Sequence, residues 1–123
     1  MLTLRINGDA KEFSPGQVVA GVMGWELIHP PSEAFLRLVW YTQGRGDQDV
    51  NIAEEQELPA NQLAVEQTFQ FTLPAAPYSF AGALISLQWA IELVLNKGKD
   101  SLRIDIVVSP WTEMLKLSSV EMK

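Results

Sequence analysis

The strongest constraint on the fold is an alternation of apolar and other residues, with a period of two, that begins at residue 85. The apolar positions are Ile85, Leu87, Trp89, Ile91, Leu93 and Leu95, and the positions between them include serine, glutamine, alanine and glutamate. Successive side chains of a strand point to opposite faces, so the pattern predicts a long strand with one face in the core. Several of these residues also favour helices, but the apolar positions follow no 3.6-residue stripe.

The same alternation resumes after a polar turn at residues 96–100 that contains glycine. Its apolar positions are Leu102, Ile104, Ile106 and Val108. Two alternating runs joined by five polar residues are typical of a β-hairpin.

Earlier segments repeat this pattern and predict further strands. They cover residues 65–73, 36–41 with a shorter return near Val50 and Ile52, 2–6, and 17–27, where Gly21 and Gly24 suggest bulges or close backbone approaches. About seven strands with turn residues between them predict an all-β fold, an antiparallel immunoglobulin-like β-sandwich. We expect this sandwich to occupy residues 1–110 and a C-terminal tail to follow over residues 111–123.

Two segments carry a resemblance to a known family. Residues 13–21 read FSPGQVVAG, in which Pro15 and Gly16 suit the two central positions of a type II turn. Residues 71–82 read FTLPAAPYSFAG and precede the long strand that carries Trp89. In this order and spacing the two segments resemble the arrestin-like superfamily, over roughly residues 2–108.

The resemblance implies a single arrestin N-terminal-like β-sandwich that serves as an adaptor without enzymatic activity, as in arrestins, arrestin-shaped retromer subunits and bacterial sporulation-control proteins. The chain has room for one sandwich, whereas arrestins have two. We find in this sequence no residues that match the buried charged cluster of arrestins or the paired lysines with which arrestins sense receptor phosphate. Phospho-receptor binding is therefore not transferred to this chain.

Composition narrows the classes of partner. The net charge is -6, and no cluster of lysine and arginine suits a polyphosphate backbone, so we expect no nucleic acid. The chain contains no cysteine, which excludes disulfides and thiolate chemistry and makes a cytoplasmic location the default. Neither the N-terminal residues nor the apolar run at 81–95 has the length of a signal or a membrane span, so we expect no membrane insertion.

Candidate reactive and metal-ligating residues are few. His29 is the only histidine and precedes two prolines, so we interpret it as a loop residue rather than part of a catalytic or metal site. Several acidic residues lie near the predicted return strand at Val50 and Ile52. They could bind a hard cation weakly but are typical of a solvated edge, and they are Asp47, Asp49, Glu54, Glu55 and Glu57. Residues 45–47 match an integrin-binding tripeptide, which turn chemistry explains. We expect no cofactor and no metal.

Four tryptophans leave two functional hypotheses open. Trp25, Trp40 and Trp89 fall in predicted strands and favour core packing, whereas aromatic platforms would indicate a carbohydrate-binding or small-ligand-binding sandwich. The tail is apolar enough to dock on its own sandwich or on a partner, and its candidate contact residues are Trp111, Met114, Leu115 and Leu117. We favour a non-enzymatic module that binds a protein partner through exposed sheet edges or this tail, with homo-oligomerisation left open.

Overall fold

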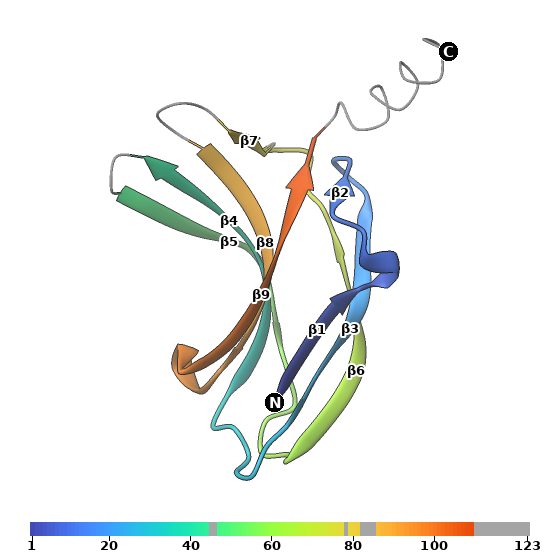
Figure 1. Cartoon of the computed structure of the whole chain (residues 1–123), viewed down its shortest axis with the longest axis vertical. Coiled ribbons are helices and arrows are strands. Elements are labelled where there is room, and N and C mark those ends of the chain that lie inside the picture. The colour runs from blue at the N-terminus through green and yellow to red at the C-terminus, as the bar shows by residue number, and fades with distance from the viewer. Residues whose placement is uncertain (45–46, 78, 82–85, 110–123) are drawn as a thin grey trace.

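Two β-sheets packed face to face make up the chain in a computed structural model that describes residues 1–44, 47–77, 79–81 and 86–109 (Figure 1). The three-stranded sheet has the order β1 (Leu2–Ile6), β3 (Val18–Glu26) and β6 (Ala64–Thr72). The six-stranded sheet has the order β2 (Glu12–Phe13), β9 (Asp100–Val108), β8 (Ser86–Leu95), β4 (Ala34–Gly44) and β5 (Asp47–Glu57), and β7 (Phe80–Ala81) also pairs with β8. The predicted all-β sandwich is confirmed, because the described residues otherwise contain only the short 3-10 turns Asn7–Asp9 and Asn96–Gly98.

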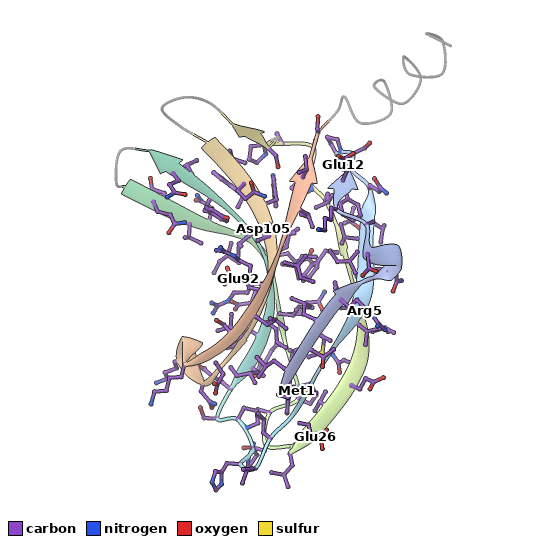
Figure 2. All side chains as sticks on the ribbon, viewed as in Figure 1. Met1, Arg5, Glu12, Glu26, Glu92 and Asp105 are labelled. Atoms are coloured by element: carbon purple, nitrogen blue, oxygen red, sulfur yellow. The ribbon has the colours of Figure 1, made fainter. Side chains whose placement is uncertain are left out.

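The long alternating run forms β8, which lies in the middle of the six-stranded sheet. Its odd-numbered side chains fill the space between the sheets, and Trp89, Ile91, Leu93 and Leu95 have no exposed surface. Figure 2 shows this layer of side chains between the two sheets. The predicted hairpin is also confirmed, since β8 and β9 pair antiparallel with Trp89 opposite Ile106 and Leu95 opposite Asp100.

Three details differ from the sequence-based expectation. The return strand near Val50 is not short: β5 has eleven residues, as many as β4. It lies at the edge of the sheet and most of its side chains are exposed, so apolar alternation marked only two of its positions. The sheet is not purely antiparallel, because β2 pairs parallel with β9. The described residues form nine strands where about seven were expected, because the two-residue strands β2 and β7 add to seven longer ones.

The turn before β3 has the predicted geometry. The Gln17 backbone N–H donates to the Ser14 carbonyl oxygen at 3.1 Å, and Gly16 has a φ of +82°, which a residue with a side chain rarely adopts. Within β3, a Cβ atom at Gly21 would collide with the carbonyl oxygen of Arg5 and lie 2.9 Å from the ring of Phe69. Gly21 therefore marks a close approach of strands, and the register of β3 with β1 and β6 continues past it without a bulge.

Hydrogen bonds fix the connection that leads from β6 to β8. The indole N–H of Trp89 donates to the Pro77 carbonyl oxygen at 3.0 Å. Ser79 holds the end of β9, because its backbone N–H donates to the Val108 carbonyl oxygen at 2.7 Å and its hydroxyl accepts from the Val108 N–H at 3.0 Å. Trp89 thus fills the core and also satisfies the backbone of the connection above it.

Replacing Trp89 with alanine should lower the free energy of unfolding by about 3 to 5 kcal/mol, the usual cost of removing a large buried aromatic side chain. Chemical denaturation followed by far-UV circular dichroism measures this loss. The control is Ile28→Ala, because Ile28 is 88% exposed and its truncation should change stability by less than about 0.5 kcal/mol. A loss below about 1 kcal/mol for Trp89→Ala would contradict the burial of this side chain.

Candidate functional site

The candidate site is the outer face of the six-stranded sheet, the face turned away from the three-stranded sheet. Strand β4 divides its side chains between the two faces: Leu36 and Leu38 join the main core, whereas Val39 and Tyr41 belong to a second buried cluster together with Ala90 of β8. Tyr41 is 9% exposed and the other two are almost fully buried. An outer sheet face with its own buried apolar centre is an ordered surface.

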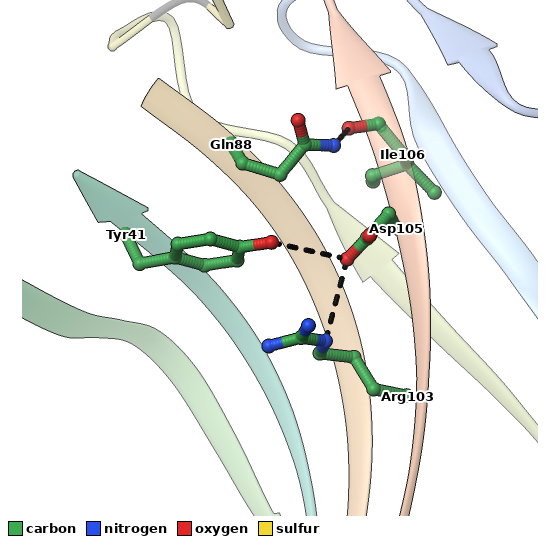
Figure 3. A network of polar contacts seen from close by, with 5 residues as sticks. All are labelled: Tyr41, Gln88, Arg103, Asp105 and Ile106. Atoms are coloured by element: carbon green, nitrogen blue, oxygen red, sulfur yellow. Dashed lines mark hydrogen bonds and ion pairs between the residues drawn. The ribbon is translucent and has the colours of Figure 1, made fainter. Parts of the chain in front are cut away.

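The small side chain of Ala90 lets residues of β9 and β4 meet above β8. Ala90 lies opposite Val39 on one side and Asp105 on the other. Across it the Tyr41 hydroxyl donates to Oδ1 of Asp105 at 3.4 Å, a weak hydrogen bond, and the Arg103 guanidinium lies 5.0 Å from the centre of the Tyr41 ring (Figure 3). Arg103 also forms an ion pair with Asp105, with Nε 3.4 Å from Oδ1.

The surroundings of Tyr41 raise the pKa of its phenol above the ordinary value. Burial is the largest cause, and the negative charge of Asp105 adds to it, while the positive charge of Arg103 opposes it. A phenol with a raised pKa stays protonated at neutral pH. Tyr41 is therefore a hydrogen-bond donor and a packing surface here, and not an activated nucleophile.

Beside this cluster, charges of alternating sign cross the sheet. The register places Arg103 opposite Glu92, Glu92 opposite Arg37, and Arg37 opposite Glu55, so one row runs through β9, β8, β4 and β5. Arg37 and Glu55 form an ion pair, with Nε 2.6 Å from Oε2. Figure 2 shows Glu92 and Asp105 on this side of the sheet. Opposite charges on neighbouring strands stabilise their pairing and hold the long side chains in place.

The apolar centre continues to the edge of the sheet. Val39 lies opposite Ile52 and Tyr41 lies opposite Val50, so both side chains of β5 extend the buried cluster outwards. Val50 is 58% exposed and Ile52 is 51% exposed. Ala53 has no opposite residue in β4 and forms a bulge, and three of the five acidic residues of β5 follow it.

Hollows elsewhere on the described surface are modest. A groove between β1 and β9 has a volume of about 230 Å³, which is smaller than the roughly 300 to 1,000 Å³ of typical ligand pockets. Its apolar lining comes from Leu4, Ile6, Ala10 and Ile104. A second hollow of about 400 Å³ lies beside His29 and is bordered by the highly exposed Ile28. Neither hollow offers the enclosed apolar walls of a small-molecule site.

The tryptophans that the structure describes favour core packing. Trp25 is 3% exposed and its indole N–H donates to the Gln62 carbonyl oxygen at 2.9 Å, Trp89 is fully buried, and Trp40 is half-buried against the main core. None of these three rings forms an open platform for a sugar. His29 is exposed in the loop after β3, as its interpretation as a loop residue requires.

Other candidate residues fall outside the described part of the chain. The proposed tail contacts Trp111, Met114, Leu115 and Leu117 and the Arg45-Gly46 part of the tripeptide lie there. Within the described residues, no three histidine or acidic side chains are grouped closely enough to hold a metal ion. No helix among them has the length and apolar character needed to cross a membrane.

Comparison with known proteins identifies the architecture. No protein-family model matches the sequence, and no curated protein matches it. The crystal structure of Spo0M, a sporulation control protein from Bacillus subtilis, matches with a TM-score of 0.59 over 98% of this chain. The fold is arrestin-like. The two sequences are 18% identical, and the match covers 54% of the Spo0M chain, so this chain spans about half the length of that protein. The likeness confirms the fold that the two sequence segments indicated.

Sequence reasoning missed the cluster around Tyr41. The relevant signal was present, because Val39 and Tyr41 lie at the positions of β4 that alternate with its core residues. Their partners Arg103 and Asp105 are charged residues more than sixty positions further along the chain. Only the register of three neighbouring strands brings them to Tyr41, and a single sequence does not give that register.

The raised pKa of Tyr41 predicts a loss of stability at alkaline pH. The unfolded chain releases the phenolic proton near pH 10, whereas the folded chain retains it, so the stabilisation is complete below about pH 10 and is lost as pH rises through the folded pKa. Tyr41→Phe removes this dependence. Denaturation midpoints measured from pH 8 to pH 11 should therefore fall less steeply in Tyr41→Phe than in the unsubstituted protein.

A second variant reads the phenol directly. Tyr78→Phe leaves Tyr41 as the only tyrosine, so ultraviolet absorbance of the phenolate reports its titration alone. A titration midpoint at or below 10 would show that burial and Asp105 do not raise the pKa of Tyr41.

Proposed function

We propose that the chain is a non-enzymatic protein-interaction module that binds a partner protein through the outer face of the six-stranded sheet and the adjoining strand β5. One observation carries the proposal: β5 pairs with β4 along one side and with no other described strand along the other. A long unpaired edge presents backbone N–H and C=O groups to which a second chain can pair. Beside it, the outer face offers the ordered apolar and charged rows on which a partner could rest.

The chemistry of the described residues supports a role without catalysis. The chain has no cysteine, and its single histidine is exposed in a loop. Tyr41, the one described group with a clearly perturbed pKa, is shifted towards its neutral form. The arrestin-like fold is used by adaptor proteins, which agrees with such a role. A cysteine-free chain needs no oxidising compartment, which supports a cytoplasmic setting as part of the proposal.

Site-specific photocrosslinking tests the proposal in cells of the native host. A photoreactive amino acid in place of Val50 should form crosslinks to another protein, because this side chain projects from the proposed surface. The control places the same amino acid at Thr68, which is exposed on β6 of the other sheet. Crosslinks from Val50 and not from Thr68 would support the proposed surface.

The same experiment can contradict the proposal. Crosslinks of equal yield and identity from both positions would show that contact is unspecific. If neither position yields a crosslinked protein while the chain is folded and abundant, the described surface is not an interaction site.

A further inference from the structure

Among the strands that border the two sheets, β5 offers the longest free edge. The other border strands have two residues in β2, five in β1 and nine in β6, compared with eleven in β5. Figure 1 shows β5 at the margin of the six-stranded sheet, where its upper part and that of β4 diverge from the three-stranded sheet. Most side chains of β5 are therefore exposed on both of its faces. No described strand pairs with this edge, and β6 approaches β5 near its C-terminal end, where the Gln56 side-chain amide donates to the Gln70 carbonyl oxygen at 3.1 Å.

The side chains of β5 fall into a neutral middle and acidic ends. Residues 50–53 read VNIA, and Val50 and Ile52 lie side by side on the outer face, each more than half exposed. The acidic residues on either side are Asp47, Asp49, Glu54, Glu55 and Glu57. Of these, Glu55 forms an ion pair with Arg37, and the described residues supply no cation for Asp49, Glu54 or Glu57.

Nearly the whole net charge of the chain is concentrated in this strand. Strand β5 contains five of the fifteen acidic residues and no lysine or arginine. The remaining ten acidic and nine basic residues nearly cancel, although the chain as a whole carries a net charge of -6. A strand with this charge attracts cationic segments and repels acidic ones, and the attraction weakens as salt is added.

We propose that β5 binds an extended cationic segment of a partner protein, which adds to the six-stranded sheet as a further strand. On the outer face, apolar side chains of the segment would continue the row formed by Val50 and Ile52. On the opposite face, its lysine or arginine side chains would lie beside Asp49, Asn51 and Glu54, because successive side chains of a strand alternate between faces. The segment therefore alternates apolar and basic residues. This inference rests on the proposed interaction role and specifies its partner.

A second copy of the chain fits this edge poorly. Antiparallel pairing of two β5 strands would bring five acidic residues of one copy against five of the other, and like charges on neighbouring strands destabilise their pairing. The acidic ends and the bulge at Ala53 also discourage unspecific pairing, a common protection of edge strands. The uncharged middle between them remains open to a segment whose charge is complementary.

Fluorescence anisotropy with synthetic peptides tests the inference on the full chain. A labelled peptide of alternating valine and lysine should bind, and one of alternating valine and glutamate should not. Two further valine-lysine peptides carry backbone N-methyl groups at alternate residues, one on each edge of the extended peptide. Strand addition uses the N–H groups of one edge only, so one N-methylated peptide should lose binding and the other should keep it.

Charge variants of the protein locate the binding. Asp49→Lys combined with Glu54→Lys should reverse the preference between the lysine and glutamate peptides, with about a tenfold change in affinity for each. Glu12→Lys combined with Glu66→Lys is the matched control, because it changes the net charge equally at exposed positions of two other border strands. This control should keep the original preference, and amide chemical-shift changes on peptide binding should centre on residues 48–56.

Three outcomes would overturn the inference. Equal binding of both N-methylated peptides would show attraction without strand addition, and equal loss in both charge variants would show a response to net charge alone. A dimer of the unsubstituted chain that pairs through β5, detected by analytical ultracentrifugation and amide shifts, would assign this edge to a second copy. If crosslinks from Val50 persist while no peptide binds, the interaction role stands and the cationic segment is wrong.

Discussion

The burial of β8 on both of its faces is the constraint on which the rest of the structure depends. Its inner side chains fill the space between the sheets, while Ala90 and Val94 on the outer side are also buried, at 0% and 7% exposure. A strand with so little exposed surface must have neighbours on both edges, and β4 and β9 supply them along most of its length. The connection between β6 and β8 is held in turn, because the Trp89 indole N–H donates to the Pro77 carbonyl oxygen. Ser79 in this connection accepts a hydrogen bond from the Val108 N–H at the end of β9.

The outer face inherits its order from this central strand. A larger side chain at position 90 would stand between Tyr41 and Asp105 and would prevent their contact across β8. With alanine there, the ring of Tyr41, the guanidinium of Arg103 and the carboxylate of Asp105 form one layer above the strand. Because each of these side chains contacts another, the face is pre-organised, which would lower the entropy lost in the proposed binding of a partner. The apolar positions of β5 adjoin this ordered layer and do not stand alone.

Residues that are buried on one face of a strand were predictable from the sequence. The alternation through Trp89, the hairpin that follows it and the turn at Pro15 and Gly16 all depend on local periodicity or on turn geometry, which one sequence records. The length of β5 was not predictable in this way, since an edge strand exposed on both faces has no apolar alternation to show. The contact between Tyr41 and Asp105 was hidden for another reason, because it depends on the register of strands far apart in the chain.

In the proposed role, strand β5 is protected against pairing with its own copies and yet open to pairing with a partner segment. Acidic side chains at its ends would repel a second copy of the chain, a common protection of edge strands against aggregation. In the proposed interaction the same charges would favour partners of opposite sign, because specificity can come from repulsion of a competitor as well as from attraction of a partner. Lysines at these positions would also protect the edge but would attract acidic segments, so in the proposed interaction the sign of the charge would determine which partners bind. Because the rest of the chain is nearly neutral, long-range attraction of a cationic partner would act mainly at this edge, where no described strand pairs with the backbone.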